Sequence, residues 1–259
     1  MGEREHCYSH CSDAGNNMRH PGHAVDNGTI LAIDTSTERL GVALLHGTRC
    51  IERQLQLGTG HANQVLALVA EVLAEADIPL SAMDAIAFSR GPGAFTGLRI
   101  AIGVAQGLAL ALECPVVPVS GLRVLAAGVT LPGPVLAVID ARMGEFYAAS
   151  WLSGAAAFAG AAAALPESLL PPGALQTPCA SLEVWHAVGP GWPALGATGQ
   201  APGGSGPWVA TWPEVSVLAR LGRAGLARGE GCDPADALPV YLRDQVARPS
   251  INPNVTQLS

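Results

Sequence analysis

Charged side chains are scarce in this chain. They make up 14% of its 259 residues, and their formal sum is −7 at pH 7. A net acidic chain offers no general electrostatic attraction for nucleic acid or for an anionic membrane surface. Aromatic residues are also few, at 5%, which argues against a surface that stacks bases. We therefore expect no strong direct binding of nucleic acid and no association with a membrane.

An apolar run of the kind that opens a secretory signal peptide is absent near the first residue. Of the six cysteines, those at positions 50, 114, 179 and 232 are scattered along the chain. Scattered cysteines are typical of proteins kept reduced. Both features predict a cytoplasmic protein.

Residues 1–28 differ in composition from the rest of the chain. They hold four of the seven histidines together with Cys7 and Cys11, and they show no apolar periodicity. The spacing of these cysteines lacks the paired pattern of a structural zinc site, so metal binding is only the alternative here. We predict that residues 1–28 and 248–259 are disordered extensions, because polar segments without periodicity rarely fold.

The first half of the chain alternates between strand and helix patterns. The segments in order are 29–34, 40–46, 48–57, 63–77, 85–89, 97–113, 115–119, 121–128, 135–140 and 145–151. The first three predict an antiparallel meander, and the βα units after it predict an α/β fold with a mixed sheet covered by helices. This is the order of one lobe of the actin-like fold. We place a first lobe at 29–130 and a second, smaller lobe at 131–247, with the boundary near 130–150, where the chain can cross between the lobes and return.

The remaining half carries weaker signals. Residues 154–210 are rich in Ala, Gly and Pro and predict mostly loops or short elements. Residues 188–192 predict a strand that runs into a turn, and their glycines fit either a phosphate-approach loop or a plain turn. Residues 215–228 predict a helix.

A glycine-rich loop joins the strand at 85–89 to the long helix after it. Gly91, Gly93 and Gly97 allow positive φ values and close approach to a neighbour, and Thr96 is placed to cap the helix. A strand, a glycine loop and a helix in this order can bind a phosphate. The same order also fits a tight crossover turn.

The helix predicted over residues 98–112 is apolar on all sides except at Arg99 and Gln106. Such a helix must be covered on several sides. Gly103 and Gly107 form a ridge of small residues that lets another helix approach closely, but the run is shorter than the ~20 residues that span a membrane. The cover comes either from the domain itself or from another protein.

Several segments, taken in order, resemble the TsaB (YeaZ) family. They are residues 30–37, His61 and residues 91–99, 139–145, 188–192 and 239–243, and the resemblance extends over residues 29–247. It implies an actin-like, ribonuclease H-like fold with two lobes. It also implies a subunit of the bacterial complex that makes N6-threonylcarbamoyladenosine at position 37 of tRNA.

The resemblance further implies that this subunit is not the catalyst. In the family it pairs with the homologous TsaD, which carries the metal and transfers the threonylcarbamoyl group, and with the ATPase TsaE. A scaffold of this kind needs no metal and no resident cofactor, with a nucleotide at the partner interface as the alternative. Without its partner it could form a homodimer.

The catalytic relatives carry a His-x₃-His pair just after the strand that here ends at Val119. The matching stretch, residues 120–125, contains no histidine and no carboxylate, so a metal site of that kind cannot be assembled there. The histidines outside the first 28 residues are His46, His61 and His186, far apart in sequence. We expect His61 at the surface near the start of a helix, with a partner or ligand contact as the alternative.

Asp34 ends the first strand, where actin-like ATPases keep a carboxylate. Thr35 and Ser36 follow it in place of a glycine and crowd the approach of a phosphate, so we interpret Asp34 as a turn cap. Together with the loop, these positions form a vestigial phosphate site, made of Asp34, Thr35, Gly91, Gly93, Thr96 and Gly97.

The alternative function is an actin-like small-molecule kinase or ATPase that uses Asp34 and this loop. A glycoprotease-like hydrolase is a second alternative.

The two long helices, 63–77 and 98–112, are the predicted partner interface. Its residues are Leu68, Val69, Arg99, Ala101, Gly103, Ala105 and Gly107. A cation near a helix N-terminus is electrostatically disfavoured, so Arg99 pairs with a partner carboxylate or anion, or else lies over the sheet edge. Asp140 and Arg142 are expected to pair with each other across a tight turn.

Overall fold

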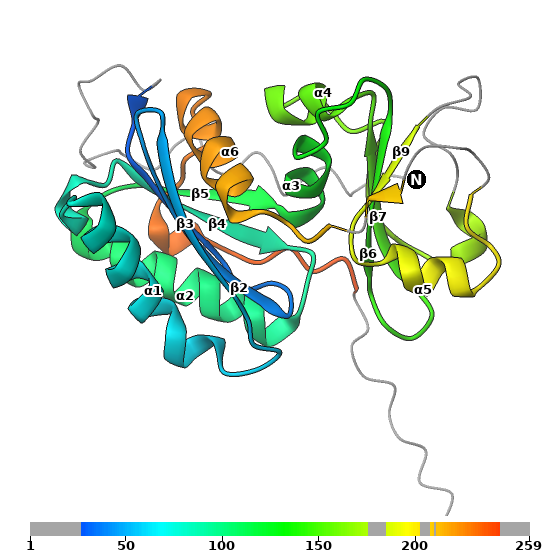
Figure 1. Cartoon of the computed structure of the whole chain (residues 1–259), viewed down its shortest axis with the longest axis horizontal. Helices are drawn as coiled ribbons and strands as arrows, with labels where there is room; N and C mark the ends of the chain where they lie inside the picture. The colour runs from blue at the N-terminus through cyan, green and yellow to red at the C-terminus, as the bar shows by residue number, and fades with distance from the viewer. Residues whose placement is uncertain (1–26, 176–184, 203–207, 210, 244–259) are drawn as a thin grey trace, which may run out of the picture.

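Two five-stranded sheets stand side by side in the computed structural model, each with helices packed against it (Figure 1). The structure describes residues 27–175, 185–202, 208–209 and 211–243. The extensions predicted at 1–28 and 248–259 lie outside these ranges, except for residues 27 and 28.

The first sheet has the strand order β3-β2-β1-β4-β5. Its strands are β1 (Ile30–Asp34), β2 (Arg39–His46), β3 (Arg49–Gln56), β4 (Ala85–Gly91) and β5 (Val116–Ser120). β1, β2 and β3 pair antiparallel, whereas β4 and β5 continue the sheet parallel to β1. The predicted meander and the mixed sheet are therefore confirmed.

Helices cover both faces of this sheet. α1 (His61–Ala76) and α2 (Phe95–Leu112) lie on one face, and α6 (Val215–Ala227) lies on the other (Figure 1). Alternate residues of β1 therefore enter two cores, with Leu31 and Ile33 toward α1 and α2 and Ile30 toward α6. Burial on both faces explains why this strand is an uninterrupted apolar run.

The second sheet repeats the topology of the first. Its strands are β6 (Val135–Asp140), β7 (Phe146–Trp151), β8 (Leu165–Leu170), β9 (His186–Val188) and β10 (Trp208–Val209). β6, β7 and β8 form an antiparallel meander, and β9 and β10 run parallel to β6, so β6 occupies the place of β1. The α/β, two-lobed actin-like fold is confirmed by this duplication.

Short helices complete the second lobe. They are α3 (Gly121–Ala127), α4 (Gly154–Ala159) and α5 (Trp192–Ala197). α3 and α4 pack on one face of the second sheet, and α5 packs on the other. Single 3₁₀ turns, η2, η3 and η4, lie at Leu80–Ala82, Pro172–Ala174 and Pro234–Asp236.

The predicted ranges 29–130 and 131–247 need two corrections, because α3 at 121–127 already packs on the second sheet and the chain returns to the first lobe after residue 214. α6 packs on β1, β2 and β4, and the backbones of Val116 and Cys232 form an antiparallel bridge. The segment predicted to hold mostly loops or short elements, 154–210, contains the six-residue elements α4, β8 and α5. Residues 131–247 are thus not one continuous lobe.

Candidate functional site

The turn after β1 is buried and held together by its own carboxylate. Asp34 is 4% exposed, and its Oδ1 accepts a 2.8 Å hydrogen bond from the backbone N–H of Ser36. Burial raises the pKa of Asp34, while the hydrogen bonds from Ser36 and the charge of His61 oppose that rise. The interpretation of Asp34 as a turn cap is confirmed.

The glycine loop closes on this same turn. The N–H of Ala94 donates to the carbonyl oxygen of Ser36 at 2.8 Å, and the hydroxyl of Thr35 donates to the carbonyl oxygen of Gly97 at 2.6 Å. A side chain at Gly93 would collide with the carbonyl oxygen of Ser36, and one at Gly97 with the carbonyl oxygen of Thr35. The absence of side chains at these glycines therefore allows the turn after β1 to pack directly against the loop.

The predicted cap at Thr96 is wrong. α2 begins at Phe95, its N-cap residue is Ala94, and no side chain caps its first turn. Thr96 lies inside that turn with an exposed side chain. The helix starts earlier because Ala94 is already fixed by its bond to Ser36.

The second lobe repeats the closed arrangement. Oδ1 of Asp140, at the end of β6, accepts a 2.7 Å hydrogen bond from the N–H of Arg142, whose side chain also reaches the carboxylate at 3.4 Å. The expected local pairing is thus confirmed.

A side chain at Gly189 would collide with the carbonyl of Val138, and the N–H of Gly191 donates to that carbonyl. Residues 188–192 are a strand end and a tight turn that leads into α5.

Ion pairs join the two lobes near these turns. Arg90, at the end of β4, contacts Glu167 of β8 at 2.8 Å, and their side chains are 12% and 17% exposed. The segment after η4 also bridges the lobes. The N–H of Val240 donates to the backbone carbonyl oxygen of Arg90 in the first lobe, and Arg243 forms a 2.7 Å ion pair with Glu145 in the second. Sequence reasoning missed these contacts, since the paired residues lie far apart along the chain.

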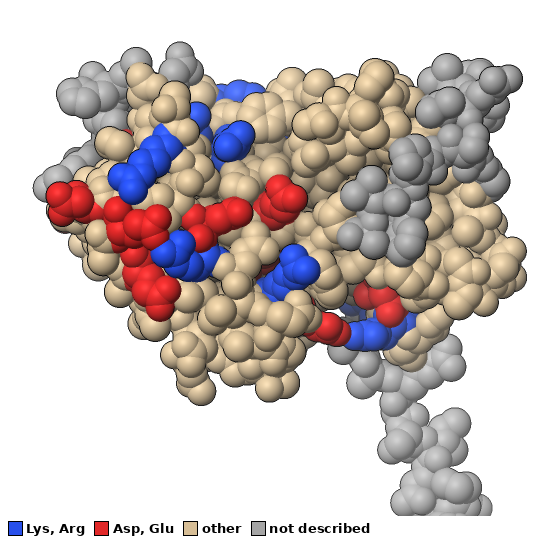
Figure 2. Space-filling model, viewed as in Figure 1, with Lys and Arg blue, Asp and Glu red and all other residues tan. Residues whose placement is uncertain are grey.

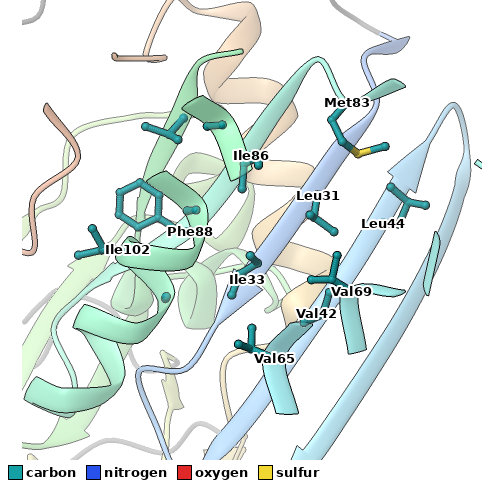
Figure 3. Packing of buried hydrophobic residues seen from close by; sticks show 14 of the residues in the cluster. Leu31, Ile33, Val42, Leu44, Val65, Val69, Met83, Ile86, Phe88 and Ile102 are labelled. Atoms are coloured by element: carbon teal, nitrogen blue, oxygen red, sulfur yellow. The ribbon is translucent and has the colours of Figure 1, made fainter. Parts of the chain in front are cut away.

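Of the residues predicted for the partner interface, Leu68, Val69, Ala101 and Ala105 are buried in the first core. They point toward the sheet, as the labelled Val65 and Val69 do in Figure 3, so no partner can reach them. The assignment of these positions to a surface is therefore wrong. Arg99, Gly103 and Gly107 lie on the exposed side of α2.

The outward sides of α1 and α2 form an apolar surface, which we call the α1–α2 face. Its residues are Leu66, Ala67, Ala70 and Ala74 of α1 and Phe95, Arg99, Ile100, Gly103, Val104, Gly107, Leu108 and Leu110 of α2. Leu66 and Leu110 are more than half exposed, and Arg99 is the charged residue on the α2 side. By length and composition α2 could cross a membrane, but its inner side packs against β4, as core helices do.

Charged side chains are distributed unevenly. In the view of Figure 2 they gather over the first lobe and along the junction, whereas the described surface of the second lobe shows almost none. The pairs of Arg53 with Glu71 and Glu75 belong to the first lobe and tie β3 to α1.

Comparison with known proteins identifies the family. The profile described as "TsaD: tRNA N6-adenosine threonylcarbamoyltransferase" matches residues 57–178. The tRNA threonylcarbamoyladenosine biosynthesis protein TsaB of Haemophilus influenzae is 43% identical over 48% of this chain and 53% of its own length. The Escherichia coli protein of the same name is 36% identical over 84% of this chain and 96% of its own length. This chain belongs to the TsaB family.

A solved structure agrees with that assignment. YeaZ from Pseudomonas aeruginosa is 41% identical, superposes with a TM-score of 0.74, and is covered over its whole length by 83% of this chain. Similarity at this level fixes the fold of the TsaB-family chain across both lobes.

In this TsaB-family chain the stretch 120–125 forms the end of β5 and the start of α3, and Leu122 and Leu125 are buried in the core of the second lobe. Within the described ranges, no three His, Cys, Asp or Glu side chains come together as a metal site. His61 is buried, and the expectation of a surface histidine is therefore wrong. Its Nε2 has no partner among the described residues.

Proposed function

We propose that this chain acts in the synthesis of N6-threonylcarbamoyladenosine on tRNA as a non-catalytic subunit that pairs with a TsaD-type catalytic subunit. A TsaE-type ATPase would complete the complex. The observation that carries the proposal is the closure of the glycine loop on Thr35 and Ser36. Membership of the TsaB family supports the pathway, and the family profile that matches residues 57–178 relates the chain to its proposed partner.

The α1–α2 face is the proposed docking surface. It joins exposed Leu66 and Leu110 to the open ridge of Gly103 and Gly107, where a Cβ atom would meet nothing within 4 Å. Large apolar surfaces of this kind are usually covered in the working protein. A homologous subunit presents helices in equivalent places, so the two pairs would pack together, and a second copy of this chain would occupy the face when the partner is absent.

The enzymatic alternatives lack support in the geometry. A kinase or ATPase that used Asp34 would need room for a phosphate beside the loop, and the protein's own backbone fills that room. A hydrolase of the glycoprotease kind would need metal ligands in the stretch 120–125, which contains no histidine, cysteine or carboxylate. The proposal includes no resident metal or cofactor, and the alternative is a nucleotide bound at the subunit interface. It also places the complex in the cytoplasm.

The test is binding to the TsaD-type subunit of the same organism, measured by isothermal titration calorimetry. Gly103→Glu places an unpaired charge at the centre of the α1–α2 face and should abolish measurable binding, because burying such a charge is costly. Arg220→Glu is the matched control, because Arg220 is an exposed residue of α6 on the opposite side of the sheet. Unchanged affinity of a folded Gly103→Glu variant would show that the interface lies elsewhere.

A further inference from the structure

Arg99 is held in a fixed position on the surface by two aromatic rings. Its guanidinium carbon lies 3.9 Å from the centre of the Phe95 ring, and its Nε donates a 3.2 Å hydrogen bond to the hydroxyl of Tyr241. The two rings stack on each other with centroids 5.3 Å apart. Arg99 therefore does not lie over the sheet edge, which was the alternative drawn from the sequence.

The positive charge of Arg99 is not neutralised within the described part of the chain. None of the ion pairs there includes Arg99, and the first turn of α2 contains no acidic residue. The N-terminal end of a helix is itself positive, so a cation there is disfavoured unless an anion compensates it. Nε is engaged by Tyr241, which leaves the two terminal nitrogens as donors for a ligand outside the chain.

Arg99 also lies in line with the open glycines. Residues 99, 103 and 107 are spaced by four and therefore lie along one side of α2. The glycine positions have open space before them, so a helix of another protein can approach the α2 backbone closely there. Arg99 lies one helical turn before Gly103, so the end of such a helix comes within its reach.

We propose that Arg99 is the charged anchor of the docking surface and receives a carboxylate from an acidic side chain of the catalytic subunit. This inference rests on the proposed function. The aromatic pair holds the side chain in place before binding, so less conformational entropy is lost when the carboxylate arrives. Arginine and tyrosine are also the residues that most often dominate the binding energy of an interface.

The surroundings of Arg99 favour a protein carboxylate over a nucleic-acid phosphate. Its contacts are aromatic, with Phe95 45% and Tyr241 41% exposed, and the nearby segment carries Leu238 with 70% of its surface exposed. Apolar side chains around one arginine match a protein interface with a desolvated ion pair. A phosphate backbone would instead be recognised by several cations.

Charge removal at Arg99 is the direct test, with the full chain and the TsaD-type subunit as the two components. Arg99→Gln should weaken binding about 30-fold or more, and Arg99→Glu should weaken it further, because each leaves the partner carboxylate without its cation. Arg99→Lys keeps the charge but loses the planar group over Phe95, so its affinity should lie between those of wild type and Arg99→Gln. Tyr241→Phe removes the hydroxyl that fixes Nε and should lower affinity by a smaller factor.

Controls separate this inference from the proposed function. Thermal unfolding shows whether each variant is folded, and Arg220→Glu should bind as wild type does. The dissociation constant of wild type should rise with added NaCl, and that dependence should be weaker for Arg99→Gln.

Each outcome decides one of the two proposals. If wild type does not bind the TsaD-type subunit, the proposed function fails. Suppose that wild type binds, that Gly103→Glu does not, and that Arg99→Gln binds with unchanged affinity. The proposed role of Arg99 is then wrong, whereas the α1–α2 face remains the docking surface. If Arg99→Gln leaves subunit binding intact but lowers retention of tRNA by the assembled complex, the ligand of Arg99 is a phosphate, and the inference of a carboxylate is overturned.

Discussion

The hydroxyl of Thr35 donates a 2.6 Å hydrogen bond to the carbonyl oxygen of Gly97, and the carbonyl of Thr35 lies where a side chain at Gly97 would have to be. These residues are 62 positions apart. Their mutual contact packs the glycine loop directly against the turn after β1.

Gly97→Ala should therefore destabilise the protein by about 3 kcal/mol, the upper end of the cost of overpacking, because the obstacle is backbone and cannot rotate away. Gly103→Ala is the matched control on the same helix, since its Cβ would meet nothing within 4 Å. That change should stabilise the isolated chain by about 0.5–1 kcal/mol. Urea unfolding measures both, and equal effects of the two substitutions would contradict the closed-loop description.

The ion pairs between the lobes should differ in their contribution according to burial. Glu167→Ala should cost about 2–3 kcal/mol, because it removes a mostly buried ion pair with Arg90. Glu38→Ala removes the exposed pair with Arg142 at 3.7 Å and should change stability by about 0.5 kcal/mol or less. Chemical unfolding of both variants measures the two free energies, and a larger loss of stability for Glu38→Ala than for Glu167→Ala would contradict the dependence on burial.

Asp34 should make stability depend on pH. Burial raises its pKa above the ordinary value of 3.8, so the folded state holds a proton that the unfolded state has released at the same pH. The stability of the wild type should fall as pH rises from about 4 through the raised pKa. Asp34→Asn can still accept the bond from Ser36 and should lose this dependence.

At neutral pH, Asp34→Asn should be at least as stable as wild type, and the difference should shrink as the pH approaches 4. Thermal unfolding across this range measures it. A variant that is less stable than wild type at pH 7, with the gap closing in acid, would mean that the ionised carboxylate stabilises the turn.

Most of the first lobe could be predicted from its sequence because its signals are local. β1 to β3 are joined by short turns, and the βα units after them alternate clear apolar strands with helical periods. The second lobe repeats the same topology, but its Ala-, Gly- and Pro-rich segments have weak periodicity, so the sequence predicts short elements there without the bounds or types of α4, β8 and α5. The return of α6 to the first sheet depends on contacts such as that of Gly222 with Ala87, which no local pattern reveals.

The candidate interface was predicted only in outline for a related reason. α2 is apolar on every side, so no polar stripe marks which side faces water. The prediction therefore places Ala101 and Ala105 on the surface, whereas the structure buries them, as it buries Leu68 of α1. Arg99 was identified as unusual from its place near a helix start, but its contact with Tyr241 spans 142 positions and could come only from the fold.

The central claim is tested most directly by transfer of the threonylcarbamoyl group to tRNA in a reconstituted reaction, with this chain alone, with the TsaD- and TsaE-type subunits alone, and with all three. The proposed function predicts no transfer by this chain alone and a large increase when it joins the other two. Asp34→Asn should support the same increase as wild type, whereas Gly103→Glu should not. Transfer by the isolated chain, or its loss from the complete set when a folded and fully bound Asp34→Asn variant replaces wild type, would contradict the account.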